Sequence, residues 1–367
     1  MLRRDMRLLW ISARVFGKDM AGTMETGLLS ALNENGVDIT LISPGEFSDS
    51  AVSQIEVKML SFPGLKTLSG ARYIKSFLKN ELQSHPDVIM IDWRYVYSLR
   101  NFLNSSLVPW FIVDRGPPAN RGFLKKLQKW FWKKGWIVAG NNSCGGFVVS
   151  EMHKSFVKNL TNVNLNIKIL PAGANKNNYS LTKSDPKELL KLVYVGTIDS
   201  RRGVKKIFKL CSNLEKNLIK YNLIICGEGD LNKDFNYLSS LRDNVIFYGQ
   251  TPHNEVIKLL SQSHIGIMPM PDMPIWRIAS PLKLMEYLSA GLLIAGPKHS
   301  GNQIRESGPW NLLSDEDWTE DTIYKINKLS SEDWIRFSES AINESKKYLW
   351  PNIAKKFIQD IENLIDL

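Results

Sequence analysis

The chain has 367 residues, 43% of them hydrophobic, and a formal net charge of +10 at pH 7. A chain of this length exceeds the size of one typical hydrophobic core, so we expect two domains. No apolar run reaches the roughly 18 to 20 residues that cross a bilayer, and the first apolar segment is too short for a secretory signal. These features predict a cytoplasmic protein.

The cysteines and the excess of basic residues narrow the possible functions. Cys144, Cys211 and Cys226 are odd in number and widely spaced, which argues against a disulfide framework or a zinc site. The positive charge predicts a polyanionic partner, which is nucleic acid, an anionic membrane surface or a phosphorylated substrate. The sequence has no zinc-finger spacing, helix-turn-helix signature or RNA-recognition pattern, so we expect no nucleic-acid partner.

The first half of the chain alternates short apolar runs with amphipathic stretches. Over 24–33, Leu28, Leu29 and Leu32 fall on one helical stripe. Strands are predicted at 6–12, 38–43, 88–92, 110–114 and 146–150. This alternation is typical of a parallel α/β domain.

The same pattern begins again after a polar segment that follows Pro171. Strands are predicted at 192–196, 223–227, 245–249, 265–269 and 292–296. Several of them end at a glycine, where the backbone can approach a ligand at the carboxyl edge of a sheet. We therefore predict two Rossmann-like domains joined near 172–190.

A nicotinamide-dependent oxidoreductase would use similar domains, but the glycine loops do not fit one. Gly227 and Gly229 lack the third glycine of the dinucleotide fingerprint, and the loop after the first strand does not match it either. No P-loop lysine follows a glycine run.

The stretch 121–136, "RGFLKKLQKWFWKKGW", predicts an amphipathic basic helix. One arc carries Phe123, Leu124, Leu127, Trp130 and Phe131, and the opposite arc carries Lys125, Lys126, Lys129 and Lys133. Trp132 and Trp136 fall near the basic side, where Trp and Lys together suit a membrane interface. The alternative is a surface helix whose apolar stripe packs on the first sheet.

Two other polar groups have structural explanations. Asp315 and Asp317 precede a helical pattern, which favours a helix cap over a metal site. His153 is expected on a helix surface. We therefore predict no metal ligand.

The order of several motifs resembles that of the GT-B glycosyltransferases, and specifically the retaining glycosyltransferase family 4. The motifs are "YVGTIDSRRGVKKI" from Tyr194, "ICGEGDL" from Ile225, "VIFYGQTPHNEVIKLLSQSHIGIMP" from Val245, "SPLKLMEYLSAGLLIAG" from Ser280 and "YLWPNIAKKFIQDIENLI" from Tyr348. In the first half, "GFVVSEMHKSF" and "ILPAGANKNNY" resemble the last segments before the linker.

This resemblance implies two Rossmann-like domains that face a central cleft. The implied boundaries are 1–180 for an acceptor-binding domain, 188–345 for a nucleotide-sugar-binding domain and 346–367 for a C-terminal helix that returns to the first domain.

The resemblance also places a donor site around the helix that follows Ser280. Glu286 would accept hydrogen bonds from ribose hydroxyls, and Ser280 would face the diphosphate near the helix start. Lys283 would either add charge to this pocket or lie solvated on the outer face of the helix. Many relatives carry a further glutamate eight positions before Glu286, where this chain has Ile278, so the donor sugar stays unspecified.

In this family, a basic pair after the first strand of the second domain stabilises the leaving diphosphate. Here Thr197 stands at the first of these positions and Arg202 at the second, which makes Arg202 the expected leaving-group stabiliser. Its near competitors for this role are Arg201, Lys205 and Lys206. Gly196, Lys206 and Gly227 complete the implied donor site. The alternative is that this basic run is only a solvated helix start.

The acceptor is expected on the first domain. Asp114 would orient an acceptor hydroxyl and Arg115 would hold a phosphate, or the two would form a surface ion pair. Gly17, Asp19 and Gly22, in the loop after the first strand, are further acceptor-side candidates.

The resemblance therefore implies a retaining glycosyltransferase that uses a nucleoside-diphosphate sugar and needs no cofactor or metal. The acceptor would be lipid-linked or a polysaccharide, and the basic helix would hold the enzyme peripherally on the cytoplasmic face of an anionic membrane. A nucleotide-sugar epimerase of the same fold, or a catalytically silent membrane-associated scaffold, would be the alternatives. The epimerase would need acid/base residues in the cleft, and the scaffold would not need Glu286 or Arg202.

Overall fold

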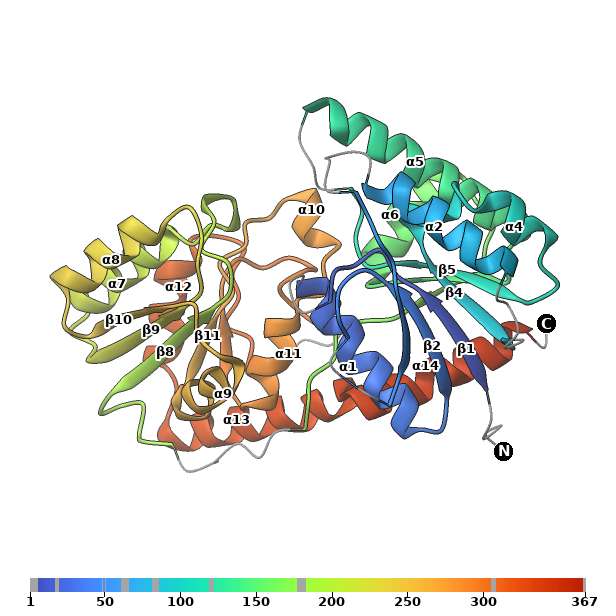
Figure 1. Cartoon of the computed structure of the whole chain (residues 1–367). Helices are drawn as coiled ribbons and strands as arrows, with labels where there is room; N and C mark the ends of the chain where they lie inside the picture. The colour runs from blue at the N-terminus through green and yellow to red at the C-terminus, as the bar shows by residue number, and fades with distance from the viewer. Residues whose placement is uncertain are drawn as a thin grey trace. The chain divides into compact units, whose positions relative to one another are not determined.

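The computed structural model of the chain describes residues 6–16, 20–47, 49, 51–60, 66–80, 86–118, 122–176, 183–304 and 308–365. It divides into two compact units. Unit 1 comprises Met1–Gly173 and Trp350–Leu367, and unit 2 comprises Ala174–Leu349. Each unit contains a parallel β-sheet covered by helices (Figure 1). This confirms the predicted α/β class with two Rossmann-like domains.

The sheet of unit 1 has the strand order β3-β2-β1-β4-β5-β6-β7 over the described residues. Its strands are β1 (Arg7–Ile11), β2 (Asp38–Ser43), β3 (Ser53–Glu56), β4 (Val88–Asp92), β5 (Trp110–Asp114), β6 (Gly145–Val148) and β7 (Ile167–Ile169). Its helices are α1 (Met20–Glu34), α2 (Lys66–Asn80), α3 (Trp93–Val96), α4 (Arg100–Ser105), α5 (Gly122–Asn142), α6 (Glu151–Thr161) and α14 (Trp350–Ile365). The five predicted strands are present, and β3 and β7 extend the sheet at its two edges.

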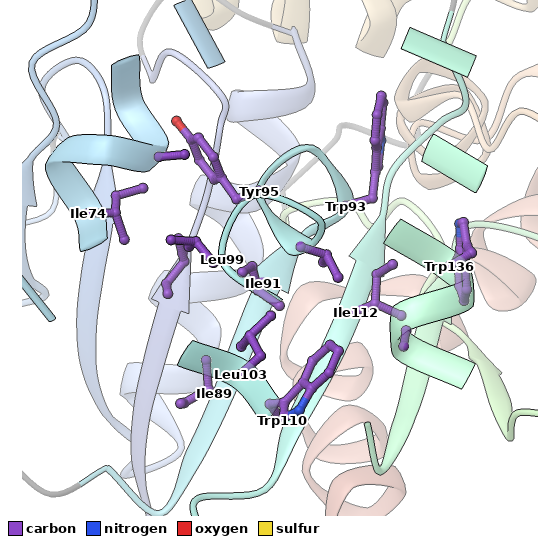
Figure 2. Close-up of a cluster of buried hydrophobic side chains, with 14 of the residues drawn as sticks. Ile74, Ile89, Ile91, Trp93, Tyr95, Leu99, Leu103, Trp110, Ile112 and Trp136 are labelled. Atoms are coloured by element: carbon purple, nitrogen blue, oxygen red, sulfur yellow. The ribbon is translucent and has the colours of Figure 1, made fainter. Parts of the chain in front are cut away.

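Alternate residues of the unit 1 strands pack against different helices. On one face, the Phe357 ring of α14 lies 6.0 Å from the Trp10 ring and 4.7 Å from the Phe147 ring. On the other face, Ile91 and Ile112 belong to a buried cluster with side chains of α2, α3 and α5 (Figure 2). Because both faces are covered, β4 and β5 are buried along their whole length.

The C-terminal helix α14 packs on α1 within unit 1. At Gly27 of α1, a Cβ atom would lie 2.3 Å from Nε1 of Trp350, the first residue of α14. Only a glycine therefore lets the two helices approach so closely at this point.

The sheet of unit 2 has the order β10-β9-β8-β11-β12 over the described residues. Its strands are β8 (Leu190–Val195), β9 (Tyr221–Cys226), β10 (Val245–Gly249), β11 (Ile265–Ile267) and β12 (Leu293–Ala295). Its helices are η1 (Ser200–Arg202), α7 (Lys206–Lys216), α8 (Asn232–Leu241), α9 (His253–Gln262), α10 (Pro274–Arg277), α11 (Leu282–Ser289), α12 (Trp318–Asn327), α13 (Ser331–Ser345) and η2 (Lys346–Tyr348).

Each sheet has a point at which the strand order reverses. In unit 1 the chain runs outward from β1 to β3 and then continues on the other side from β4. In unit 2 the reversal lies between β8 and β11. Ligands of open α/β sheets bind outside the carboxyl ends of the strands at such points, so these two edges are the places to look for a site. None of the helices formed by the described residues is long and apolar enough to cross a membrane.

Candidate active site

Helix α11 packs close to the switch point of unit 2. The Tyr287 hydroxyl accepts a hydrogen bond of 2.9 Å from the backbone N–H of Val195, the last residue of β8. At Gly266 of β11, a Cβ atom would lie 2.3 Å from Cδ2 of the Tyr287 ring. The missing side chain of Gly266 therefore makes room for α11, which brings Lys283 and Glu286 to this edge.

Lys283 is buried at the end of β8. Its Nζ lies 4.6 Å from the centroid of the Tyr194 ring and has no hydrogen-bond partner among the described residues. A Cβ atom at Gly196 would lie 2.8 Å from this Nζ. Burial and the nearby charge of Arg202 lower the pKa of Lys283 to about 7, although Glu286 opposes the shift. Lys283 is therefore not a solvated lysine on the outer face of the helix.

Glu286 lies one helical turn further along α11. Its side chain is 13% exposed, and its Oε1 lies 3.9 Å from Nδ1 of His253 at the start of α9. Burial raises the pKa of the Glu286 carboxyl, against the opposing charges of His253 and Lys283. Ser280 is half-buried just before α11, and Ile278 is buried.

In the basic loop after β8, Arg202 makes a different kind of contact from the basic residues beside it. Asp199 caps η1 by accepting the N–H of Arg201, and it also pairs with the Arg201 guanidinium. The Nζ of Lys205 lies 3.6 Å from a carboxylate of α8. Arg202 instead lies against an aromatic ring, with its Cζ 5.2 Å from the centroid of Trp276 in α10.

Two glycines allow the backbone of this loop and of the turn after β9 to pack closely against neighbouring segments. Gly203 has φ +71°, and a Cβ atom there would lie 2.2 Å from the Pro269 carbonyl oxygen in the segment after β11. Gly227 has φ +140°, and its Cβ atom would lie 1.9 Å from the Gly196 carbonyl oxygen. Both positions need glycine for conformation and for space. The Thr197 carbonyl accepts a 2.7 Å hydrogen bond from the Tyr194 hydroxyl.

The structure thus gathers most of the expected donor-site residues at one edge of unit 2. Gly196, Thr197, Arg202, Gly227, Lys283 and Glu286 lie there, whereas Lys206 is exposed at the start of α7.

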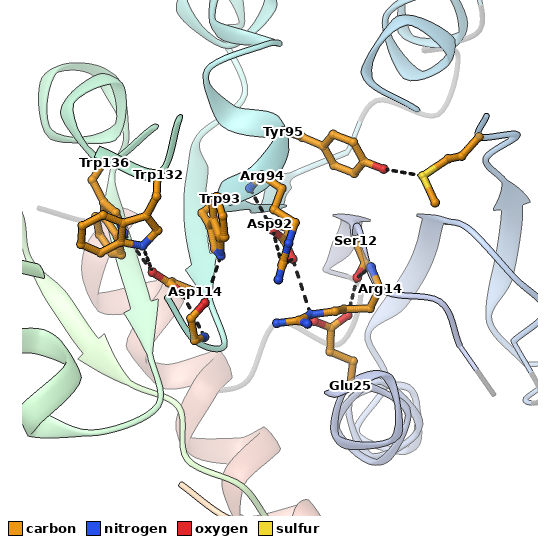
Figure 3. Close-up of polar contacts among 12 residues, drawn as sticks. Ser12, Arg14, Glu25, Asp92, Trp93, Arg94, Tyr95, Asp114, Trp132 and Trp136 are labelled. Atoms are coloured by element: carbon orange, nitrogen blue, oxygen red, sulfur yellow. Dashed lines mark hydrogen bonds and ion pairs between the residues drawn. The ribbon is translucent and has the colours of Figure 1, made fainter. Parts of the chain in front are cut away.

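In unit 1, Asp114 is the centre of a buried polar cluster (Figure 3). Its Oδ2 accepts hydrogen bonds from the indole nitrogens of Trp132 and Trp136, at 2.6 and 3.0 Å, and lies 3.4 Å from Nε2 of His153. Its Oδ1 accepts a 2.9 Å hydrogen bond from the backbone N–H of Gly116. Burial alone would raise the pKa of Asp114, but His153 and these donors lower it to about 2.

This cluster corrects three expectations. Asp114 is fully buried and cannot contact an acceptor hydroxyl. Trp132 and Trp136 do not lie at a membrane interface, because α5 turns both indoles inward to the Asp114 carboxylate. His153 lies in the core and not on a helix surface, since it packs beside the same carboxylate.

The remaining acceptor-side candidates have different surroundings. Arg115 is 8% exposed, and its Nη1 donates a 2.7 Å hydrogen bond to the Leu170 carbonyl, so it anchors the segment after β7 instead of forming a surface pair with Asp114. Burial lowers the pKa of Arg115 to about 10. Gly22 lies near the start of α1, and Gly17 and Asp19 lie outside the described residues.

The remaining expectations concern the lysines of α5 and a helix cap in unit 2. Lys125 and Lys129 of α5 are exposed and Lys133 is half-buried. Asp317 caps α12 by accepting the N–H of Thr319 at 3.1 Å, which confirms the predicted helix cap.

The switch point of unit 1 also carries a second group of polar side chains, which the sequence did not predict. Ser12 Oγ donates a 2.6 Å hydrogen bond to Oε2 of Glu25. Asp92 Oδ2 lies 2.8 Å from Nη1 of Arg94 and 3.9 Å from Nε of Arg14. The sequence does place Ser12 and Asp92 at the ends of two predicted strands, which could have indicated this group. No single sequence motif, however, connects Ser12 and Asp92 with Arg14, Glu25 and Arg94.

Comparison with known proteins identifies the class to which this arrangement belongs. Residues 176–335, which lie in unit 2, match the model of the family described as glycosyl transferases group 1. No curated protein sequence matches the chain.

Solved structures share the fold of the whole chain. Sucrose-phosphate synthase from Thermosynechococcus elongatus is similar with a TM-score of 0.74 at 14% identity, over 98% of this chain and 99% of that one. WaaG, a glycosyltransferase involved in lipopolysaccharide biosynthesis, gives 0.69 at 14% identity, over 96% and 99%. HepE of Anabaena, in complex with UDP and glucose, gives 0.68 at 10% identity, over 97% and 99%.

The two parallel sheets and the similarity to these solved structures over 96% or more of the chain show a GT-B fold. Unit 2 carries a glycosyl transferases group 1 domain, and the chain is a glycosyltransferase.

Proposed function

We propose that this glycosyltransferase moves a hexose-type residue from a nucleoside-diphosphate sugar to a lipid-linked or polysaccharide acceptor, with retention of anomeric configuration. The observation that carries the donor assignment is the Lys283 Nζ, which is buried beside Gly196 without a hydrogen-bond partner among the described residues. An unpaired buried ammonium is costly, and the oxygens of a diphosphate would pair with it. The UDP and glucose bound by HepE support the same class of donor.

In this proposal, Lys283 and Arg202 stabilise the negative charge of the departing diphosphate. Glu286 accepts hydrogen bonds from the ribose hydroxyls. The bond between the anomeric carbon and the phosphate oxygen breaks, and the acceptor hydroxyl attacks from the same face while its proton passes to the departing phosphate oxygen. Because the two basic side chains supply the positive charge, we propose that the reaction needs no metal or other cofactor.

Replacing Glu286 by glutamine is expected to lower kcat/KM for the donor about 10- to 150-fold, the range for one hydrogen bond to a charged group. The assay follows transfer, or donor hydrolysis, after nucleotide sugars have been screened for thermal stabilisation of the wild type. Glu255→Gln is the matched control, because Glu255 is exposed on α9 and pairs with Lys258. Equal kinetics of Glu286→Gln and wild type would remove Glu286 from the donor site. Failure of every nucleotide sugar to bind would reject the proposed donor class.

We also propose that unit 1 associates with an anionic membrane on its cytoplasmic side, through exposed residues of α5. This α5 surface consists of Lys125, Lys126, Lys129, Trp130 and Lys134. Trp130 is 45% exposed, and its ring lies 5.2 Å from the Tyr97 ring. The sequences of α2, α4 and α5 contain no aspartate or glutamate that would repel anionic headgroups. Exposed lysine beside exposed tryptophan suits a headgroup region.

Changing Lys125, Lys129 and Lys134 together to glutamate should weaken binding to vesicles that contain phosphatidylglycerol by more than about 100-fold, since each lysine contributes about 1 kcal/mol. Co-sedimentation at low and high salt measures this, because salt screens the attraction. The control changes three exposed lysines of unit 2, Lys216, Lys220 and Lys233, by the same charge. An equal loss in the control would mean that net charge, and not the α5 surface, directs the binding.

A further inference from the structure

Trp276 is the aromatic partner of Arg202, the residue proposed to stabilise the departing diphosphate. Its ring centroid lies 5.2 Å from Cζ of Arg202, and both side chains are half-buried. Arg201, the residue before Arg202, pairs instead with the carboxylate of Asp199. Arg202 therefore has a different type of partner from that of its neighbour in the same loop.

An aromatic ring holds a guanidinium group without neutralising it. The electrons on the face of an indole attract a cation, and tryptophan does so more strongly than the other aromatic residues. A carboxylate at the same place would occupy the N–H donors of the arginine and oppose its charge. The contact with Trp276 thus restricts the Arg202 side chain while its positive charge is kept for an incoming anion.

The backbone beside Arg202 packs against the segment that leads into α10. A Cβ atom at Gly203 would lie 2.2 Å from the Pro269 carbonyl oxygen, so the two main chains approach closely at this point. The Arg202 N–H donates a 2.9 Å hydrogen bond to the Asp199 carbonyl, which closes the turn of η1. The loop therefore presents Arg202 to α10 from a fixed backbone.

Helix α10 has only four residues, but contacts outside the helix hold it in place. The Ser300 hydroxyl donates a 2.7 Å hydrogen bond to the Arg277 carbonyl at the end of α10. A Cβ atom at Gly301 would lie 1.8 Å from the Trp276 carbonyl oxygen, so the loop after β12 packs directly on the helix. Nη2 of Arg277 also donates a 2.7 Å hydrogen bond to Asp272, just before the helix. Trp276 therefore stands on an anchored support.

From these contacts we propose that Trp276 is a positioning residue, whose ring holds the Arg202 guanidinium where the diphosphate of the donor departs. Positive charge that is already in place when the phosphate oxygen leaves needs no reorganisation during the reaction. An arginine without this contact would sample more rotamers and lose part of the benefit. The inference rests on the proposed function, because Trp276 acts on the reaction only through Arg202.

The test combines kinetics of the full-length chain with a double-mutant cycle. Trp276→Leu removes the ring and keeps an apolar side chain. We expect it to lower kcat about 3- to 30-fold, the range of one cation–π contact, and to change KM for the nucleotide sugar less than about threefold. Trp276→Phe, whose ring attracts a cation more weakly, should lie between Trp276→Leu and the wild type. In a chain that already carries Arg202→Ala, Trp276→Leu should cause no further loss of kcat.

Tyr324→Leu is the matched control. It removes another cation–π contact of unit 2, in which Nζ of Lys328 lies 3.8 Å from the centroid of the exposed Tyr324 ring. This contact lies at the end of α12, so kcat should not change. Urea unfolding shows whether each variant keeps its fold, and the cycle is measured with Trp276→Phe if Trp276→Leu does not fold.

The outcomes separate this inference from the proposed function. Equal kinetics of Trp276→Leu and the wild type, while Arg202→Ala lowers kcat, would reject the inference alone. A loss that is just as large in the Arg202→Ala background would also overturn it, because Trp276 would then act through another residue. Unchanged kcat in Arg202→Ala itself would reject both the inference and the role of Arg202 in the proposed function.

Discussion

Replacing Lys283 by methionine is expected to lower kcat about 100- to 1,000-fold, the usual loss when one preorganised group that stabilises developing charge is removed. The same change should leave the protein at least as stable as the wild type. Lys283 is buried and its Nζ has no hydrogen-bond partner among the described residues, so its charge opposes folding. The contact with the Tyr194 ring offsets only about 0.5 to 2 kcal/mol of this cost. Methionine fills a similar volume without a charge.

Kinetics and urea unfolding of the same samples separate the two effects. Lys205→Met is the control, because Lys205 is an exposed lysine of the neighbouring loop that pairs with a carboxylate. A variant that loses stability and activity together would show that Lys283 is a structural residue. Unchanged kcat would show that the diphosphate does not reach it.

The pH dependence of stability gives an independent check on Lys283. Its pKa is lowered to about 7 in the folded protein, whereas a lysine in an unfolded chain titrates near 10.4. Between these values the unfolded chain binds more protons, so the stability of the wild type should rise with pH across this window. Lys183, whose pKa burial also lowers to about 7, contributes a similar slope. The difference between wild type and Lys283→Met isolates the Lys283 share.

The sequence predicted the elements whose residues form a local pattern. The five predicted strands of each sheet stand out as apolar runs, and most of them are buried along their length because parallel strands are covered on both faces. The edge strands β3, "SQIE", and β7, "IKI", were missed because they are short and half exposed.

The errors all involve partners that are distant in the sequence. Trp132 and Trp136 lie among lysines on the helical wheel, and only the fold places Asp114 where both indoles can donate to it. For Lys283 the sequence left two alternatives open, and the contact with Gly196, at the end of another strand, decides between them. Helical periodicity describes which residues share a face, and it does not describe what that face meets.

The Asp114 cluster gives the largest expected effect on stability. Replacing Asp114 by asparagine should lower the free energy of unfolding at pH 7 by about 3 to 5 kcal/mol, the usual loss when one partner of a buried charged group is removed. The amide has a single acceptor oxygen for the indoles of Trp132 and Trp136. Its NH₂ group, itself a donor, would face either the indole N–H groups or the backbone N–H of Gly116, so one of these donors would lose its acceptor.

The pH dependence of this loss follows from the pKa of Asp114, which is lowered to about 2 in the folded state, below its ordinary value near 3.9. A depressed carboxyl pKa stabilises the fold above the unfolded value, and this contribution disappears as pH falls from about 4 to 2. The difference in free energy of unfolding between wild type and Asp114→Asn should therefore be largest at pH 7 and become smaller below pH 4. Urea unfolding at several pH values measures this difference in stability, and hydrogen exchange of the β5 amides locates it in unit 1.

The control is Asp87→Asn, which breaks the exposed pair with Arg7 and should change stability by less than about 1 kcal/mol. If Asp114→Asn and Asp87→Asn have equally small effects at pH 7, the buried carboxylate does not organise α5 and α6 around β5.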